Sequence, residues 1–201
     1  MRRAWYQGKT LAAIMLSRYA WRSTLVVIRQ TKAMRFLTIV RHCEAEPGAD
    51  DFVRTLTDRG RRQAEEIRSR VLDGEQLAQY GPVTALVSSA ARTRETYALG
   101  FAGTAFVHAL ETSELIYNGQ REVTPYEVLE QLAAIDPVRE SLLVIGHFPW
   151  VWQLVNELTA EMPEALISDY PLGTAVVLAI PEDEQVGLRH YEVAAVFIPT
   201  I

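Results

Sequence analysis

The sequence predicts an α/β fold, a three-layer α/β/α sandwich around a mainly parallel central sheet. Short apolar runs typical of buried strands alternate along the chain with segments of helical periodicity. The 201 residues are 49% hydrophobic and 22% charged, which is enough apolar chain for one core. Neither an internal repeat nor a Gly/Ser-rich linker follows Met34. These observations indicate one globular domain and exclude a mainly disordered chain.

The charge pattern separates the first 33 residues from the remainder. They hold seven basic and no acidic residues, whereas 13 basic and 25 acidic residues follow from Met34 onward. Arg18 and Arg22 interrupt the apolar stretches well before the roughly 18 to 20 residues that a membrane-spanning helix needs. We therefore expect residues 1–33 to be a basic extension, either disordered or not translated, and residues 34–201 to form one domain. A transit-like segment or a membrane-surface helix is the alternative interpretation.

Cysteine content and charge exclude several classes of partner. Cys43 is the single cysteine, so it can neither close an intrachain disulfide nor form the Cys/His cluster of a structural zinc site. The acidic body disfavours nucleic acid. We expect a cytoplasmic protein without metal, nucleic-acid partner or stable membrane insertion, and make no prediction of its oligomeric state.

The individual elements follow from periodicity and capping signals. Thr57 is a helix cap, and Thr124, Pro125 and Glu127 form a capping-box start. Helices are expected from about 58 to 73, 90 to 99, 125 to 134 and 150 to 158. Strands are expected at 36–40, 83–87, 142–145, 175–180 and 191–198, and the last two should pair at the far side of the sheet.

Cation-capable side chains follow three of the predicted strands. Arg41 and His42 end the first, Arg92 comes shortly after the second, and His147 follows the third. Ligands of open α/β sheets bind outside the carboxyl ends of the strands, so these groups should converge. Guanidinium forks grip phosphoryl oxygens and an imidazole can attack phosphorus. The helix opening near Ser89 should direct unpaired amides at the same anion.

Four ordered segments resemble the histidine phosphatase superfamily, the phosphoglycerate-mutase-like proteins. Residues 41–46 (Arg-His-Cys-Glu-Ala-Glu) resemble its Arg-His-Gly signature, and 54–60 (Arg-Thr-Leu-Thr-Asp-Arg-Gly) its Arg-Pro-Leu-Thr segment. Residues 88–96 resemble Ser-Pro-x-x-Arg-x-x-x-Thr, and 146–149 (Gly-His-Phe-Pro) resemble Gly-His-Asn-Pro. The short chain and the Arg-x-Leu-Thr segment are similar to the small branch, the SixA-type phosphohistidine phosphatases.

The resemblance implies a metal-independent phosphatase without a cofactor. It makes His42 the nucleophile that carries a transient phosphohistidine, while Arg41, Arg92 and His147 hold the three phosphoryl oxygens. Substrate-binding roles are also expected for three further residues: Arg54, Cys43 and Ser89. Arg54 is equally well interpreted as a surface charge.

The sequence specifies the proton donor less clearly than the other catalytic roles. Glu114 resembles the acid position of the larger phosphatases, and Asp51 and Glu44 compete with it. A phosphoramidate substrate would depend less on a proton from a carboxylic acid. Arg94 and Glu95 are expected on an exposed helix face. His108 and His190 lie in strand-like runs without a motif around them and are expected to have packing roles only.

Two residues depart from the family pattern: Cys43 replaces a glycine and Phe148 an asparagine. A cysteine among cations is expected to gain thiolate character, and oxidation sensitivity would follow. The expected substrate is a phosphorylated protein or a small phosphorylated metabolite. A catalytically weak phosphate-binding regulatory module is the alternative from another functional class.

Overall fold

The computed structural model describes residues 34–73, 76–119, 121–135, 140–166, 169–187 and 190–201. The prediction for residues 1–33 therefore lies outside the described residues. Six strands form one sheet: β1 (Met34–Arg41), β2 (Val83–Ser88), β3 (Val107–Ser113), β4 (Ser141–Gly146), β5 (Ala175–Pro181) and β6 (Glu192–Phe197). Five correspond to predicted strands, whereas β3, which contains His108, was not among them.

The strand order is β3-β2-β4-β1-β5-β6, and its first four strands are parallel. β5 runs antiparallel to β1 and β6 antiparallel to β5, so the final two strands complete the side of the sheet next to β1. The predicted mainly parallel sheet and the pairing of its last two strands are confirmed.

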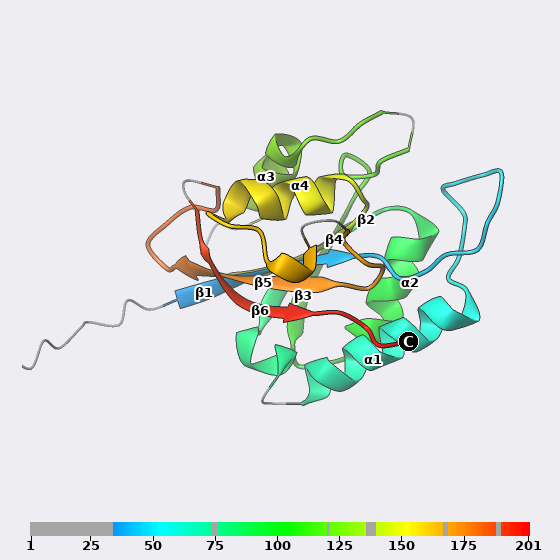
Figure 1. Cartoon of the computed structure of the whole chain (residues 1–201), viewed down its shortest axis with the longest axis horizontal. Helices are drawn as coiled ribbons and strands as arrows, with labels where there is room; N and C mark the ends of the chain where they lie inside the picture. Colours follow the sequence, from blue (N-terminus) through cyan, green and yellow to red (C-terminus); the bar gives the residue numbers. More distant parts are fainter. Residues whose placement is uncertain (1–33, 74–75, 120, 136–139, 167–168, 188–189) are drawn as a thin grey trace, which may run out of the picture. The chain divides into compact units, whose positions relative to one another are not determined.

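In the part of the chain that the structure describes, four α-helices cover the sheet: α1 (Asp58–Leu72), α2 (Ala91–Gly100), α3 (Pro125–Ala134) and α4 (Trp150–Leu158). α1 and α2 lie on one face and α3 and α4 on the other, which gives the predicted three layers (Figure 1). Short 3₁₀ turns at Leu77–Tyr80 and Glu164–Leu166 complete the regular structure.

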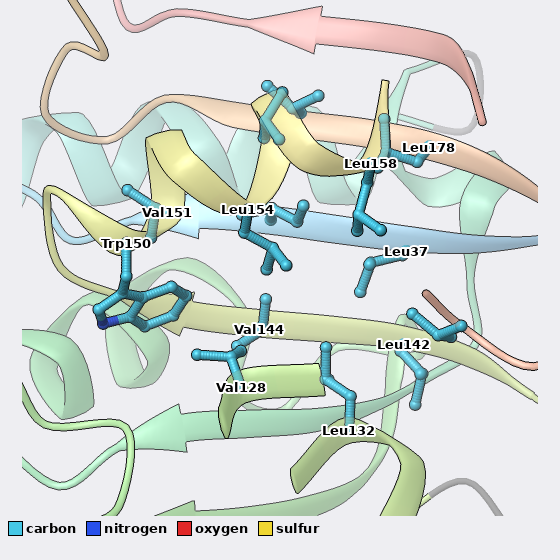
Figure 2. Close-up of a cluster of buried hydrophobic side chains, with 14 of the residues drawn as sticks. Leu37, Val128, Leu132, Leu142, Val144, Trp150, Val151, Leu154, Leu158 and Leu178 are labelled. Atoms are coloured by element: carbon cyan, nitrogen blue, oxygen red, sulfur yellow. The ribbon is translucent and has the colours of Figure 1, made fainter. Parts of the chain in front are cut away.

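Strand periodicity divides the apolar side chains between two cores. Leu142 and Val144 of β4 face α3 and α4, whereas Leu143 and Ile145 of the same strand face α1 and α2. Figure 2 shows the first of these cores, where Trp150 and neighbouring side chains of α4 pack over the sheet. A strand that is buried on both faces is a continuous apolar run in the sequence, without alternating polar residues. This is why β4 could be predicted from its apolar residues alone.

The helix starts agree with the capping signals. The Thr57 hydroxyl accepts a hydrogen bond from the Gly60 amide at 2.9 Å, and Thr124 and Glu127 form the reciprocal capping box. The expectation for Glu95 is wrong. Its carboxylate accepts hydrogen bonds from the Leu56 amide at 2.7 Å and from Arg61 at 2.9 Å. These bonds connect α2 to the first turn of α1 and to the segment before it.

Parallel alignment brings the carboxyl ends of β1, β2 and β4 to one edge of the sheet. Arg41 of β1 stands in register with Gly146 of β4, and Val87 of β2 stands beside Ile145. The residues that follow these strands are therefore neighbours although they are far apart in sequence. Among the described helices, none combines the length and the apolar character needed to cross a membrane.

Candidate active site

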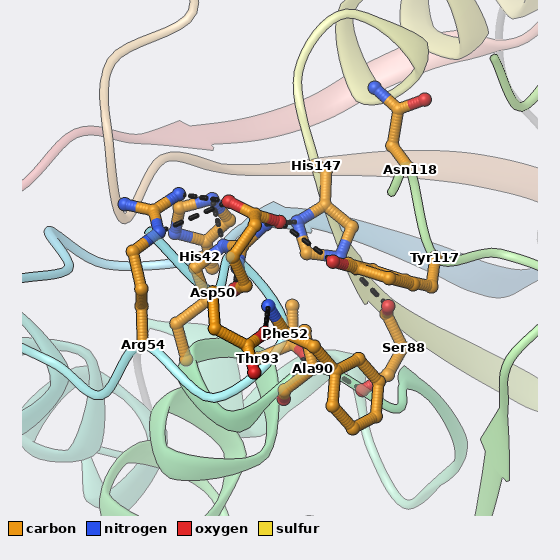
Figure 3. A network of polar contacts seen from close by, with 12 residues as sticks. His42, Asp50, Phe52, Arg54, Ser88, Ala90, Thr93, Tyr117, Asn118 and His147 are labelled. Carbon is orange, nitrogen blue, oxygen red and sulfur yellow. Dashed lines mark hydrogen bonds and ion pairs between the residues drawn. The ribbon is translucent and has the colours of Figure 1, made fainter. Parts of the chain in front are cut away.

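His42, Arg92 and His147 meet at this edge of the sheet. Their ring and guanidinium groups are in direct contact: Arg92 Nε donates to His42 Nε2 at 3.3 Å and Arg92 Nη2 lies 3.2 Å from His147 Nδ1. The two imidazole rings are 5.2 Å apart between centroids. Figure 3 shows both histidines directed toward the same space, with Arg54 and Tyr117 beside them. The predicted convergence of these three residues is present in the structure.

The hydrogen bonds of His42 define its tautomer. Nδ1 lies 2.7 Å from the Cys43 carbonyl oxygen, which can only accept, so Nδ1 carries the proton. Nε2 therefore keeps its lone pair, and it accepts from Arg92. Burial, followed by the positive charges of Arg92, Arg41 and Arg54, lowers the pKa of His42 to about 3. The ring is neutral at physiological pH, as a nucleophile must be.

His147 is neutral for similar reasons and has the opposite tautomer. Its Nδ1 faces the Arg92 guanidinium, a donor, and its Nε2 lies 2.8 Å from the buried Ser88 hydroxyl. Nε2 therefore donates to Ser88. Burial, His42 and Arg92 together lower the pKa of His147 to about 2. His147 as a whole is 3% exposed, so protein contacts surround it and determine its position.

Asp51 contacts most of the cationic groups of the site. Its Oδ2 accepts from Arg92 Nη2 at 2.9 Å and from the Tyr117 hydroxyl at 2.8 Å, while Oδ1 accepts from Arg54 Nε at 3.1 Å and from Arg54 Nη2. The Asp51 carbonyl accepts from Arg92 Nη1 at 2.6 Å. Although partial burial opposes it, these hydrogen bonds lower the pKa of Asp51, so its carboxylate is ionised.

Arg41 lies beside this cluster and has different partners. Its guanidinium donates to the Tyr170 carbonyl, lies 3.9 Å from the Asp169 carboxylate and stacks 5.2 Å from the centroid of the Phe148 ring. Its Nε is buried and has no hydrogen-bond partner within the described residues. Burial lowers its pKa, with Asp169 opposing. Phe148, at the family's asparagine position, therefore supplies a ring surface to Arg41.

The expectation that Cys43 has thiolate character is wrong. The residue is fully buried among apolar side chains between the sheet and α1, and burial raises the pKa of its thiol to about 12. Its amide donates to the Thr96 hydroxyl at 3.0 Å, which attaches the start of the loop to α2. Cys43 thus packs as a small apolar residue, and the basis for oxidation sensitivity is lost.

The other candidates occupy separate positions. Glu114 is exposed and lines a cavity of about 750 Å³ together with Asp51 and Tyr117. Glu44 is directed away, toward the start of α1, where it accepts from Arg59 at 2.9 Å. The Ser89 amide does not face an anion as expected, because it donates to the Ser113 carbonyl at 3.2 Å. The Ser89 hydroxyl is buried without a partner among the described residues.

Sequence reasoning missed two residues of the site, Tyr117 and Ser88. Tyr117 lies next to the His147 ring, at 5.6 Å between centroids, and donates to Asp51. Ser88 lies within a quoted motif, but only its contact with His147 indicates a role. A tyrosine in a loop carries no periodic or motif signal, so the sequence offered no means of finding it.

The two neutral histidines predict a pH-dependent stability. In the unfolded chain both protonate below about pH 6.5, whereas the folded protein resists protonation, so acid favours unfolding. We expect the free energy of unfolding to fall as the pH decreases through about 6.5, with a slope for each histidine that approaches about 1.4 kcal/mol per pH unit below about pH 5.5. Urea titrations at several pH values measure this slope. His147→Asn should make the slope shallower, and an unchanged slope would contradict the prediction.

Solved structures of other proteins share this architecture. No family model and no curated protein matches the sequence. A structure from Agrobacterium tumefaciens, provisionally assigned as the phosphohistidine phosphatase SixA, is 25% identical with a TM-score of 0.65 and covers 82% of this chain and 99% of that one. A similarly assigned structure from Nakamurella multipartitia is 23% identical, with a TM-score of 0.69 and coverages of 84% and 98%.

A third structure, the protein histidine phosphatase SixA complexed with tungstate, is 22% identical with a TM-score of 0.63 and covers 81% of this chain and 96% of that one. The protein therefore has the fold of the histidine phosphatase superfamily. Within that fold it is similar to the SixA-type branch, as the four motifs predicted. Within the described residues, no group of three or more His, Cys, Asp or Glu side chains could hold a metal ion.

Proposed function

We propose that the protein is a phosphatase that hydrolyses a phosphoramidate or a phosphate monoester through a phosphohistidine on His42. One observation carries this proposal: the unprotonated Nε2 of His42 lies within a cluster of fixed positive charges. A neutral imidazole nitrogen among guanidinium groups combines a nucleophile with stabilisation for the oxyanions it attacks. The SixA-type fold supports the same assignment.

The reaction has two displacements at phosphorus. In the first, His42 Nε2 forms a bond to phosphorus while the bond from phosphorus to the leaving oxygen or nitrogen breaks, and the leaving group takes up a proton. In the second, a water oxygen attacks phosphorus, the bond to Nε2 breaks, and phosphate and a proton are released. Positioning and charge stabilisation account for most of the catalysis of such transfers.

The proposed phosphoryl ligands are Arg92, Arg41 and His147, with Arg54 and the Ser89 hydroxyl as secondary contacts. For His147 to donate to an oxygen, its proton must reside on Nδ1, and Ser88 must then donate to Nε2. In the structure Arg92 Nη2 faces Nδ1 and the proton is on Nε2, so this change of tautomer requires Arg92 to transfer its hydrogen bond from Nδ1 to the phosphoryl group. The Ser88 hydroxyl can donate or accept, so its contact with Nε2 is compatible with both tautomers. Cys43 contributes through its carbonyl, which orients the nucleophile.

A phosphorylated protein histidine is the proposed first substrate and a small phosphorylated metabolite the second. The SixA neighbours support the first. An α-ribazole-5′-P phosphatase from Escherichia coli, assigned provisionally, and a mycobacterial glucosyl-3-phosphoglycerate phosphatase share the fold at 13% and 12% identity and are metabolite phosphatases by name. Phosphate release from phosphohistidine protein and from sugar phosphates, compared at equal concentrations, tests this order.

The test of the proposed function is covalent trapping. Purified protein should release phosphate in the presence of a chelator, since arginines supply the positive charge. Acid-labile, base-stable label should appear on His42 after rapid quenching with substrate labelled at phosphorus. Label on another residue, or turnover that a chelator abolishes, would contradict the proposal.

Glu114 is the proposed proton donor to an oxygen leaving group. Its carboxylate lines the cavity beside Asp51 and Tyr117, where a leaving group would lie. We expect Glu114→Gln to reduce kcat on an alkyl phosphate by about 100-fold, but to change kcat on an aryl phosphate only slightly, because a phenolate leaves without full protonation. Steady-state rates on the two esters measure this difference. Equal reductions on both would remove Glu114 from the role.

A catalytically weak phosphate-binding module is the second candidate. The dense hydrogen bonding of Arg92 favours it, because each nitrogen of the guanidinium already donates to a protein group. Such a module would bind phosphate without accumulating label on His42, so the trapping experiment separates the two candidates.

A further inference from the structure

The two peptide groups that follow His42 are each held by a buried side chain. The Cys43 amide donates to the Thr96 hydroxyl at 3.0 Å. The next amide, that of Glu44, donates to Gln63 Oε1 at 2.9 Å. This amide belongs to the same peptide group as the Cys43 carbonyl, which accepts from His42 Nδ1 at 2.7 Å. One rigid, planar peptide group therefore connects Gln63 to the imidazole ring of His42.

Both ends of the Gln63 amide are occupied, and their partners determine its orientation. Oε1 accepts from the Glu44 amide, and Nε2 donates to an oxygen of Ile201 at 3.3 Å. The opposite orientation would place a donor against a donor. Gln63 is 4% exposed, and burial of an amide is unfavourable unless the amide is hydrogen-bonded. The side chain is thus fixed with its acceptor oxygen toward the loop of residues 42–57.

Gln63 is a polar residue on the buried face of α1. The other buried residues of this helix are apolar or glycine: Gly60, Ala64, Ile67 and Val71. At Gly60 the helix approaches the loop so closely that a Cβ atom would lie 2.0 Å from the Glu44 carbonyl oxygen. Residues three apart share one helix face, so this approach brings Gln63 within reach of the Glu44 amide. The contact with the loop explains a polar side chain at a core position.

We propose that Gln63 is a positioning residue for His42 and acts through the Cys43–Glu44 peptide group. This inference rests on the proposed function, in which His42 Nε2 attacks phosphorus. As that bond forms, the ring gains positive charge and Nδ1–H becomes a stronger donor, so its hydrogen bond to the Cys43 carbonyl strengthens in the transition state. Gln63 holds this carbonyl in place, and its hydrogen bond to the other side of the peptide group polarises the carbonyl further.

Two substitutions separate the hydrogen bond from the shape of the side chain. Gln63→Met keeps an unbranched side chain and removes the acceptor. Gln63→Glu keeps an acceptor oxygen, and Arg41 and Arg59 line the same cavity, where they favour its charge. We expect label to appear on His42 about tenfold more slowly in Gln63→Met, but within about threefold of the native rate in Gln63→Glu. Packing alone predicts the reverse order, because a buried carboxylate is less favourable than a thioether.

NMR of the full chain with isotope-labelled histidine measures the His42 hydrogen bond without turnover. The His42 Nδ1 proton should be protected from solvent exchange in the native protein and in Gln63→Glu, and should exchange at least about tenfold faster in Gln63→Met. The His147 Nε2 proton, which is donated to Ser88, is the internal reference and should keep its native exchange rate. Gln63→Met should also bind inorganic phosphate with native affinity, because the proposed phosphoryl ligands are unchanged.

Gln131→Met is the matched control. Gln131 lies on α3, on the opposite face of the sheet from α1, where its Oε1 accepts from the Ser113 hydroxyl at 3.4 Å. We expect native labelling and native exchange for this variant. An equal loss of rate in Gln131→Met would overturn the proposal. The same conclusion would follow from a protected His42 proton in Gln63→Met, or from faster labelling in Gln63→Met than in Gln63→Glu.

Two further results would show a general distortion of the site instead of positioning: loss of the His147 proton in Gln63→Met, or weaker phosphate binding by that variant. Thermal melting verifies the folding of each variant. If Gln63→Met does not fold, Gln63→Glu decides, because rapid exchange of the His42 Nδ1 proton despite an acceptor at this position would overturn the proposal.

The NMR experiment also separates this inference from the proposed function. If the native protein forms no label on His42 but the Nδ1 proton depends on Gln63, the proposed function fails and the contribution of Gln63 to the His42 hydrogen bond stands. If label forms on His42 at the native rate in Gln63→Met, the positioning role fails and the proposed function stands.

Discussion

His42→Ala is expected to reduce turnover by about 10⁴-fold or more, because it removes the nitrogen that we propose as the nucleophile at phosphorus. The remaining cations still bind the phosphoryl group, so kcat should decrease far more than KM increases. Initial rates on an aryl phosphate and on phosphohistidine measure both parameters. Quenched samples of this variant should contain no acid-labile label.

His108→Ala is the control for this experiment. His108 is exposed on β3, where its ring contacts Glu140 at 2.6 Å and Thr84 at 3.2 Å, away from the three strand ends. We expect native turnover for this variant. Retention of the full rate in His42→Ala would refute the proposed function, whereas loss of rate in both variants would indicate a general effect of histidine removal on folding.

The second large effect is expected for Arg92→Ala, at about 10³-fold in kcat/KM. The guanidinium connects His42, Asp51 and His147, so the substitution removes a proposed phosphoryl ligand and the contact between the two histidines. Both the binding of substrate and the stabilisation of the transition state should weaken. Kinetics over a range of substrate concentrations separate these contributions.

Arg92→Lys distinguishes charge from geometry. A lysine keeps the positive charge but lacks the fork that contacts His42, Asp51 and His147 at once, so we expect it to recover only a small part of the rate. Arg94→Ala is the control on the same helix, because Arg94 is exposed. Full recovery by lysine would show that charge alone matters at this position.

Much of the fold was predictable from local signals. The capping residues Thr57 and Thr124 set two helix starts, and apolar runs located the strands next to the site within a residue or two. Local chemistry dominates there, because a cap bonds to amides three positions away. Glu95 was misassigned because its partners, Leu56 and Arg61, belong to a segment distant in sequence.

The site was predictable to the extent that its residues follow strand ends. His42, Arg92 and His147 were located by that rule together with the motifs, and the structure brings them into contact. The environment of Cys43 was mispredicted, because adjacency to His42 in the chain suggested a shared polar surface. Successive side chains of an extended segment point to opposite sides, and the thiol is buried in the core instead.

The sequence by itself determined all four helices, every strand except β3 and which residues end the strands next to the site, because these depend on periods and contacts within a few positions. Only the tertiary structure decided that Asp51 and Tyr117 belong to the site and that Ser88 supports His147. It also assigned the proton on each ring. These contacts and protonation states depend on side chains from separate loops and strands that lie close together only in the folded protein. Periodicity and spacing within a short segment of sequence do not predict which of them come together.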